Sequence, residues 1–60
     1  MNYYSRYKKQ IEARIAEGTL TEEYIEETTE RLDYYLGKKK LTQEEYNYLI
    51  ALLNQNEVQD

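Results

Sequence analysis

The sequence predicts an all-α fold, a small three-helix bundle with helices over about residues 3–17, 22–36 and 43–54. Three observations predict it: two nearly identical phrases, the glycines that precede them, and apolar residues spaced at the helical period. The phrases are LTEEY at 20–24 and LTQEEY at 41–46. A chain of 60 residues forms one domain at most, and its polar tail from about residue 55 is expected to fray.

Each phrase has the features of a helix start. Thr21 and Thr42 are predicted N-caps, because a threonine oxygen can accept from the unpaired amides of the next turn. The residues TQEE at 42–45 also complete a capping box. Gly18 and Gly37 are predicted to close the preceding helices, because glycine adopts the left-handed conformation at little cost.

Apolar residues recur at the helical period in each predicted helix, and together they define the candidate core. The first helix contributes Tyr4, Tyr7, Ile11 and Ile15; the second contributes Ile25, Leu32 and Leu36, with Thr28 and Thr29 between them; the third contributes Tyr46, Leu49, Ile50 and Leu53. The connections are short, so successive helices are expected to run roughly antiparallel.

The composition argues against catalysis and against a bound cofactor or metal. The chain has no cysteine and no histidine, which removes thiolate nucleophiles, imidazole bases and the usual zinc ligands. Adjacent glutamates occur in pairs, but neighbours on a helix point about 100° apart, so these pairs are expected to be solvated. We therefore expect a protein that is not an enzyme and that uses no cofactor.

The chain is expected to be cytoplasmic. It has no apolar run near the roughly 20 residues that cross a bilayer, so no membrane partner is expected. Its first ten residues, MNYYSRYKKQ, lack the apolar centre of a signal peptide. The initial Met1 indicates a complete natural chain.

Charge is unevenly distributed along the chain, whose net charge is −4. Residues 1–14 have a local charge of +3, and residues 17–33 have a local charge of −6. The second predicted helix therefore has an acidic face, formed by Glu22, Glu23, Glu26, Glu27, Glu30 and Asp33.

One basic run, residues 38–40, joins the last two predicted helices in the manner of a helix-turn-helix. Lysines there suit the negative end of the preceding helix. A DNA-reading third helix would begin QEEYNYL, with two glutamates where phosphates and base edges would be met. Direct nucleic-acid binding is therefore not expected.

Eight tyrosines, with no Phe or Trp, exceed what the predicted core uses. Tyr48 and Leu52 lie one turn apart on the back of the third helix, and Tyr34 lies about 180° from the core side of its own helix. Tyrosine is enriched at protein interfaces. The candidate partner-binding residues are Tyr48, Leu52, Tyr34 and Tyr3.

Two segments, YKKQIEARIAEGTLTEEYIEE and GKKKLTQEEYNYL, resemble the XkdX-like short proteins found among phage tail genes. That family has an aromatic-rich start, a glycine before a threonine-capped helix, and a GKIT-x-EEY ending. The likeness covers about 45 residues of this chain. The resemblance implies a phage or prophage origin and a non-enzymatic role.

Three functions remain open from the sequence. The leading hypothesis is a helical protein-interaction module that occupies a partner's surface, with a foreign protein or a homo-oligomer as its partner. The second is an acidic nucleic-acid mimic that inhibits a DNA- or RNA-binding host or defence protein. The third is a structural subunit of a phage assembly that self-associates through its tyrosines.

Overall fold

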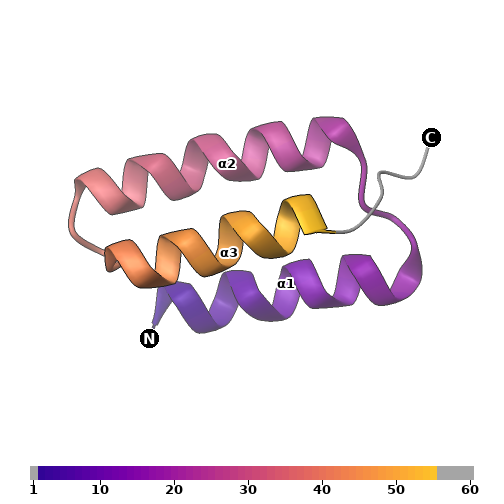
Figure 1. The fold of residues 1–60 in the computed structure, drawn as a ribbon, viewed down its shortest axis with the longest axis horizontal. Helices are drawn as coiled ribbons and strands as arrows, with labels where there is room; N and C mark the ends of the chain where they lie inside the picture. The colour runs from indigo at the N-terminus through magenta and orange to yellow at the C-terminus, as the bar shows by residue number, and fades with distance from the viewer. Residues whose placement is uncertain (1, 56–60) are drawn as a thin grey trace.

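Three α-helices make up the described part of the chain. The computed structural model describes residues 2–55, the last of these as backbone only. The helices are α1 (Tyr3–Glu17), α2 (Glu22–Gly37) and α3 (Gln43–Gln55). Successive helices fold back on one another, and α3 lies against both α1 and α2 (Figure 1). The predicted all-α three-helix fold is confirmed, with helix ends that agree to within one residue. The tail that was expected to fray lies, beyond residue 55, outside the described residues.

Side-chain caps begin all three helices. Asn2 Oδ1 accepts a hydrogen bond from the Tyr4 amide at 2.8 Å, and Thr21 Oγ1 accepts one from the Tyr24 amide at 3.1 Å. At α3, Thr42 Oγ1 accepts from the Glu45 amide at 3.1 Å, while Glu45 Oε1 accepts from the Thr42 amide at 3.0 Å. This reciprocal pair is the predicted capping box. The cap at Asn2 was not predicted.

The two glycines play different parts at the helix ends. Gly18 has φ of 70° and closes α1, with the Thr19 amide donating to the Arg14 carbonyl at 2.9 Å. Gly37 was expected to close α2 in the same way, and that expectation is wrong. Gly37 is the last residue of α2, and Lys39 has the left-handed φ of 62° instead.

The core lies where the three helices meet. Its most buried side chains are leucines and one isoleucine, and five of them are less than 2% exposed: Ile11, Leu20, Leu32, Leu49 and Leu53. Thr28 and Tyr7 are also buried. The predicted helix faces are thus confirmed: Tyr7, Ile11, Leu32, Leu49 and Leu53 are buried, and the other predicted apolar core residues, Ile50 among them, are half-buried. Leu20 and Leu41, which precede the two threonine caps, are also full members of the core.

The helices of the described segment, residues 2–55, include none that is both long enough and apolar enough to cross a membrane.

Candidate interaction surface

A cluster of tyrosines joins the start of α1 to the end of α2. Tyr35 is its centre: Tyr3 stacks on it with ring centroids 4.4 Å apart and an interplanar angle of 25°. Tyr7 approaches the same ring at 6.0 Å, and Tyr34 meets it edge-on at 5.6 Å. Aromatic pairs favour these stacked and edge-to-face arrangements. Tyr35 is therefore held by rings from two helices.

Tyr34 is the outward end of this cluster. Tyr34 is 60% exposed. Tyr48, the other exposed large hydrophobic residue of the described segment, is 44% exposed. The ammonium of Lys38 lies 5.6 Å from the centroid of the Tyr34 ring, within the range of a cation–π contact. The predicted outward position of Tyr34 is confirmed.

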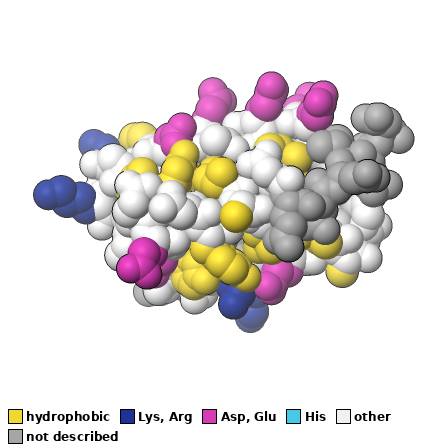
Figure 2. All heavy atoms as spheres, viewed as in Figure 1, with side chains coloured by type: hydrophobic (Ala, Val, Ile, Leu, Met, Phe, Trp, Pro, Cys, Tyr) yellow, Lys and Arg dark blue, Asp and Glu magenta, His cyan; other side chains and the backbone are white. Residues whose placement is uncertain are grey.

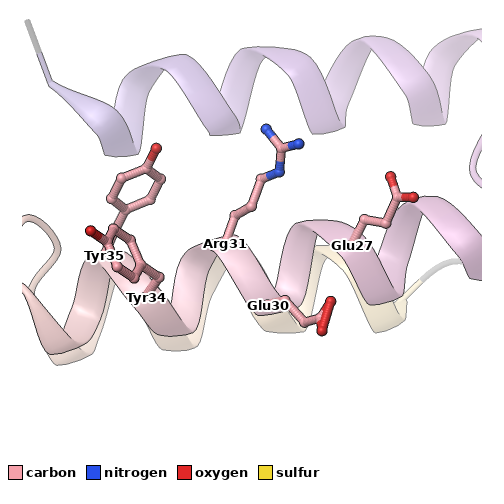
Figure 3. Close-up of a pocket in the computed structure, with 5 residues that line it drawn as sticks. All are labelled: Glu27, Glu30, Arg31, Tyr34 and Tyr35. Carbon is pink, nitrogen blue, oxygen red and sulfur yellow. The ribbon is translucent and has the colours of Figure 1, made fainter.

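A shallow hollow lies beside Tyr34, with a volume of about 570 Å³. Its lining comes entirely from α2 and consists of Glu27, Glu30, Arg31, Tyr34 and Tyr35. Figure 3 shows the side chains of Tyr35, Arg31 and Glu27 extending toward α1, whereas Glu30 points away from it. The hollow thus combines an aromatic wall with groups of both charges.

The predicted acidic face follows the outer side of α2. All six of its carboxylate residues are exposed, and at 100° per residue they fill an arc of about 140°. Acidic side chains line the outer edge of α2 in Figure 2. The face is centred nearly opposite the buried Leu32, so it is directed to solvent.

Asp33 differs from the other five acids because it is tied to α3. The Tyr46 hydroxyl donates a hydrogen bond to Asp33 Oδ1. That hydrogen bond, followed by burial and by the negative charge of Asp33, raises the pKa of Tyr46 above its ordinary value of 10.0. Asp33 therefore has a structural contact that the sequence pattern did not indicate.

The second candidate strip, on α3, is less open than predicted. Tyr48 meets Tyr4 edge-on at 6.0 Å, and the Lys8 ammonium lies 5.8 Å from its ring centroid. Leu52 was expected to lie uncovered beside it, and this is wrong: Leu52 is half-buried and packs against the core. The core reaches further around α3 than the helical period indicated, because α3 contacts two helices.

The far end of the α1–α2 boundary has a contact that sequence reasoning missed. The Arg14 guanidinium lies 4.2 Å from the centroid of the Tyr24 ring, a closer approach than either lysine contact. The Tyr24 hydroxyl is buried and has no hydrogen-bond partner among residues 2–55. Arg14 and Tyr24 are ten residues apart and lie on different helices. Their contact could therefore be predicted only from the antiparallel arrangement of α1 and α2.

The structure thus divides the four predicted partner-binding residues into two pairs. Tyr3 and Tyr34 both contact Tyr35, on the α1–α2 side. Tyr48 and Leu52 lie on α3, where Tyr48 faces Tyr4 of α1. Residues 2–55 contain no cluster of three or more acidic side chains placed to hold a metal ion.

Comparison with protein-family models, with curated proteins and with solved structures finds no match to this chain. Its function therefore has to be inferred from the geometry and charge of its own side chains.

Proposed function

We propose that this chain is a small non-enzymatic protein-interaction module, phage- or prophage-encoded, that binds and occupies the surface of a partner protein. The observation that carries the proposal is the placement of Tyr34. Its ring is 60% exposed yet held edge-on against Tyr35, which Tyr3 clamps by stacking. A fixed exposed aromatic ring loses little conformational freedom on binding, and tyrosine is enriched among residues that dominate interface energetics.

Stability gives a second reason for a partner. A 60-residue domain buries only about 60% of the surface that its unfolded chain exposes, so its own core is small. Any protein that binds the folded state alone shifts the folding equilibrium toward that state. Burial of Tyr34, with or without Tyr48, would therefore stabilise the fold while forming the complex.

Site-specific photo-crosslinking tests the proposal. The photoreactive residue p-benzoylphenylalanine would replace Tyr34 in one variant and Tyr48 in another, and both would be exposed to bacterial lysate under irradiation. Ala13, an exposed residue of α1, is the matched control position. We expect one protein to be crosslinked from position 34 or 48 and not from position 13. Equal crosslinking from all three positions, or none from any, would contradict the proposal.

The second candidate function is mimicry of a nucleic acid, and the acidic face of α2 favours it. All six of its carboxylate residues are exposed, and within residues 2–55 only Asp33 among them is hydrogen-bonded to α3. A mimic would compete with DNA or RNA for the crosslinked protein. Reversal of Glu23 and Glu26 to lysine, both outside the lining of the hollow, would then abolish binding, whereas in the leading proposal it has a smaller and salt-sensitive effect.

The third candidate is a structural subunit that self-associates. Its support is the exposure of two tyrosines, Tyr34 and Tyr48, on different faces of one small chain. Sedimentation equilibrium over a range of protein concentrations separates this candidate from the other two, because only a self-associating chain gains mass on concentration.

A further inference from the structure

We propose that the hollow on α2 binds an arginine or lysine side chain from a basic segment of the partner protein. The hollow is lined by Glu27, Glu30, Arg31, Tyr34 and Tyr35. This inference rests on the proposed function and names the chemistry of the partner. Three features carry it: a rigid aromatic wall, rings that already attract cations, and the charge of the surrounding helix face.

The aromatic wall is rigid because its inner ring is held from two sides. Tyr3 stacks on Tyr35 at 4.4 Å and Tyr7 lies 6.0 Å from it, so Tyr35 is fixed by α1. Tyr34 in turn packs its edge against Tyr35. The wall therefore needs little ordering when a ligand side chain arrives, which favours binding.

Three tyrosine rings of this protein already make cation–π contacts with lysine or arginine side chains of the same chain. Arg14 lies over Tyr24 and Lys8 lies over Tyr48, while Lys38 lies 5.6 Å from the Tyr34 ring centroid. Tyr34 is the most exposed of these three rings and the only one that lines the hollow. Lys38 is then an intramolecular competitor for the same ring, and an incoming cation has to displace it or share the ring with it.

The charge of the hollow and its surroundings complements a basic segment. Glu27 and Glu30 are exposed residues of the acidic face of α2. At 100° per residue Glu30 lies near the middle of that face and Glu27 at its edge, next to Arg31. The stretch that includes them, residues 17–33, has a charge of −6. Arg31 is the one positive group in the lining, and it extends toward α1 together with Tyr35 (Figure 3). Glu27 extends the same way, whereas Glu30 points away from α1 (Figure 3). Glu30 is therefore the carboxylate placed to meet an incoming guanidinium or ammonium away from Arg31.

A peptide titration followed by NMR tests the inference. The probe is acetyl-Gly-Arg-Gly-Arg-Gly-amide, and its control is the same peptide with uncharged citrulline in place of arginine. We expect the arginine peptide to shift the Tyr34 ring signals and the amides of Glu27 and Glu30, and the citrulline peptide to bind more weakly. Tyr34→Leu should weaken arginine-peptide binding about two- to five-fold, whereas Gln10→Leu, at an exposed residue of α1 outside the lining, should leave it unchanged.

Two further variants separate the hollow from general charge attraction. Glu30→Gln should weaken binding at low salt more than Glu26→Gln, which removes the same charge from an exposed residue outside the lining. Lys38→Met removes the competing ammonium and should strengthen binding. Equal effects of the two glutamine variants, with no effect of Tyr34→Leu, would reduce the binding to nonspecific attraction and overturn the inference.

Other occupants give other results. Concentration-dependent self-association that Tyr34→Leu abolishes would overturn the inference in favour of a second copy of this chain. If position 48 crosslinks a partner while the arginine and citrulline peptides bind alike, the proposed function stands and the cation site is wrong. If peptides bind as expected but no position crosslinks a protein, the hollow is a cation site and the proposed function fails.

Discussion

Gly18 and Lys39 end their helices in the same backbone conformation, with φ of 70° and 62° respectively. The Thr19 amide donates to the Arg14 carbonyl at 2.9 Å, and the Lys40 amide donates to the Tyr35 carbonyl at 2.8 Å. Both hydrogen bonds span five residues, which is the Schellman closure of a helix. Left-handed backbone is readily adopted by glycine and costs other residues roughly 1–2 kcal/mol. Of α1 and α2, whose ends lie within the described residues, only α1 therefore ends without that cost.

Lys39→Gly is expected to stabilise the fold by about 1 kcal/mol, because it removes the left-handed penalty and leaves the Schellman hydrogen bonds in place. Chemical denaturation measures the change in the free energy of unfolding. The complementary variant is Gly18→Ala, which should destabilise by about 1 kcal/mol. Its added Cβ would meet no atom within 4 Å, so the cost is conformational. Stabilisation by Gly18→Ala would contradict this account.

Gly37→Ala is expected to stabilise the fold by about 0.5–1 kcal/mol. Gly37 is the last residue of α2 and its φ is not in the left-handed region, and a Cβ there would meet no atom within 4 Å. Alanine loses less conformational entropy than glycine on entering a helix. Thermal unfolding should show a higher Tm for the variant, and an unchanged or lower Tm would mean that this position needs glycine for another reason.

The sequence predicted the helix starts better than the helix ends. A threonine followed by two carboxylates has one good structural interpretation, and the caps at Thr21 and Thr42 form as expected. Gly37 was misleading because glycine is tolerated inside a last helical turn as well as after it. The end of α2 also depends on the packing of Leu41, which is buried in the core. A local sequence pattern does not specify that packing.

Thr42→Ala is expected to cost on the order of 1 kcal/mol of folding free energy through loss of the N-cap. The cap is half of a capping box, so Glu45→Ala should cost less than Thr42→Ala, and the double variant should cost less than the sum of both. Urea denaturation of the four proteins completes the cycle. Strict additivity would show that the two hydrogen bonds form independently.

Leu32→Ala and Leu49→Ala should each destabilise by roughly 2–5 kcal/mol, because both side chains are 0% exposed in the core. Ile50→Ala should cost less than Leu49→Ala, since Ile50 is half-buried. Far-UV circular dichroism with thermal melting ranks the three variants. In so small a domain either leucine variant could be unfolded at room temperature, and an equal or larger loss for Ile50→Ala would mean that the core is centred differently on α3.

The candidate site was harder to predict than the core. Helical spacing placed Tyr34 on the outside correctly, because it lies nearly opposite the fully buried Leu32 on the same helix. The same reasoning failed for Leu52, because α3 lies against two helices and buries a wider arc. The Tyr3–Tyr35 stack and the Arg14–Tyr24 contact join different helices, so they depend on how α1 and α2 are placed side by side.

The contact between Tyr46 and Asp33 predicts a loss of stability at alkaline pH. The Tyr46 hydroxyl donates to the Asp33 carboxylate, and this hydrogen bond, with burial and the charge of Asp33, raises the pKa of Tyr46 in the folded protein. Folding therefore favours the protonated phenol, whose contribution is fully present below the unfolded-state pKa of 10.0 and is lost as pH rises through the higher folded-state value.

Tyr46→Phe removes this contribution at every pH, so the variant should be less stable than the wild type near neutrality. The difference in unfolding free energy between the two proteins should shrink above pH 10.0, where the wild type loses the contribution and the variant has none to lose. Measuring that difference cancels the ionisation of the other tyrosines and of the lysines. Tyr34→Phe, which alters an exposed ring, is the matched control. A difference for Tyr46→Phe that stays constant or grows with rising pH would show that the phenol–carboxylate hydrogen bond does not stabilise the fold.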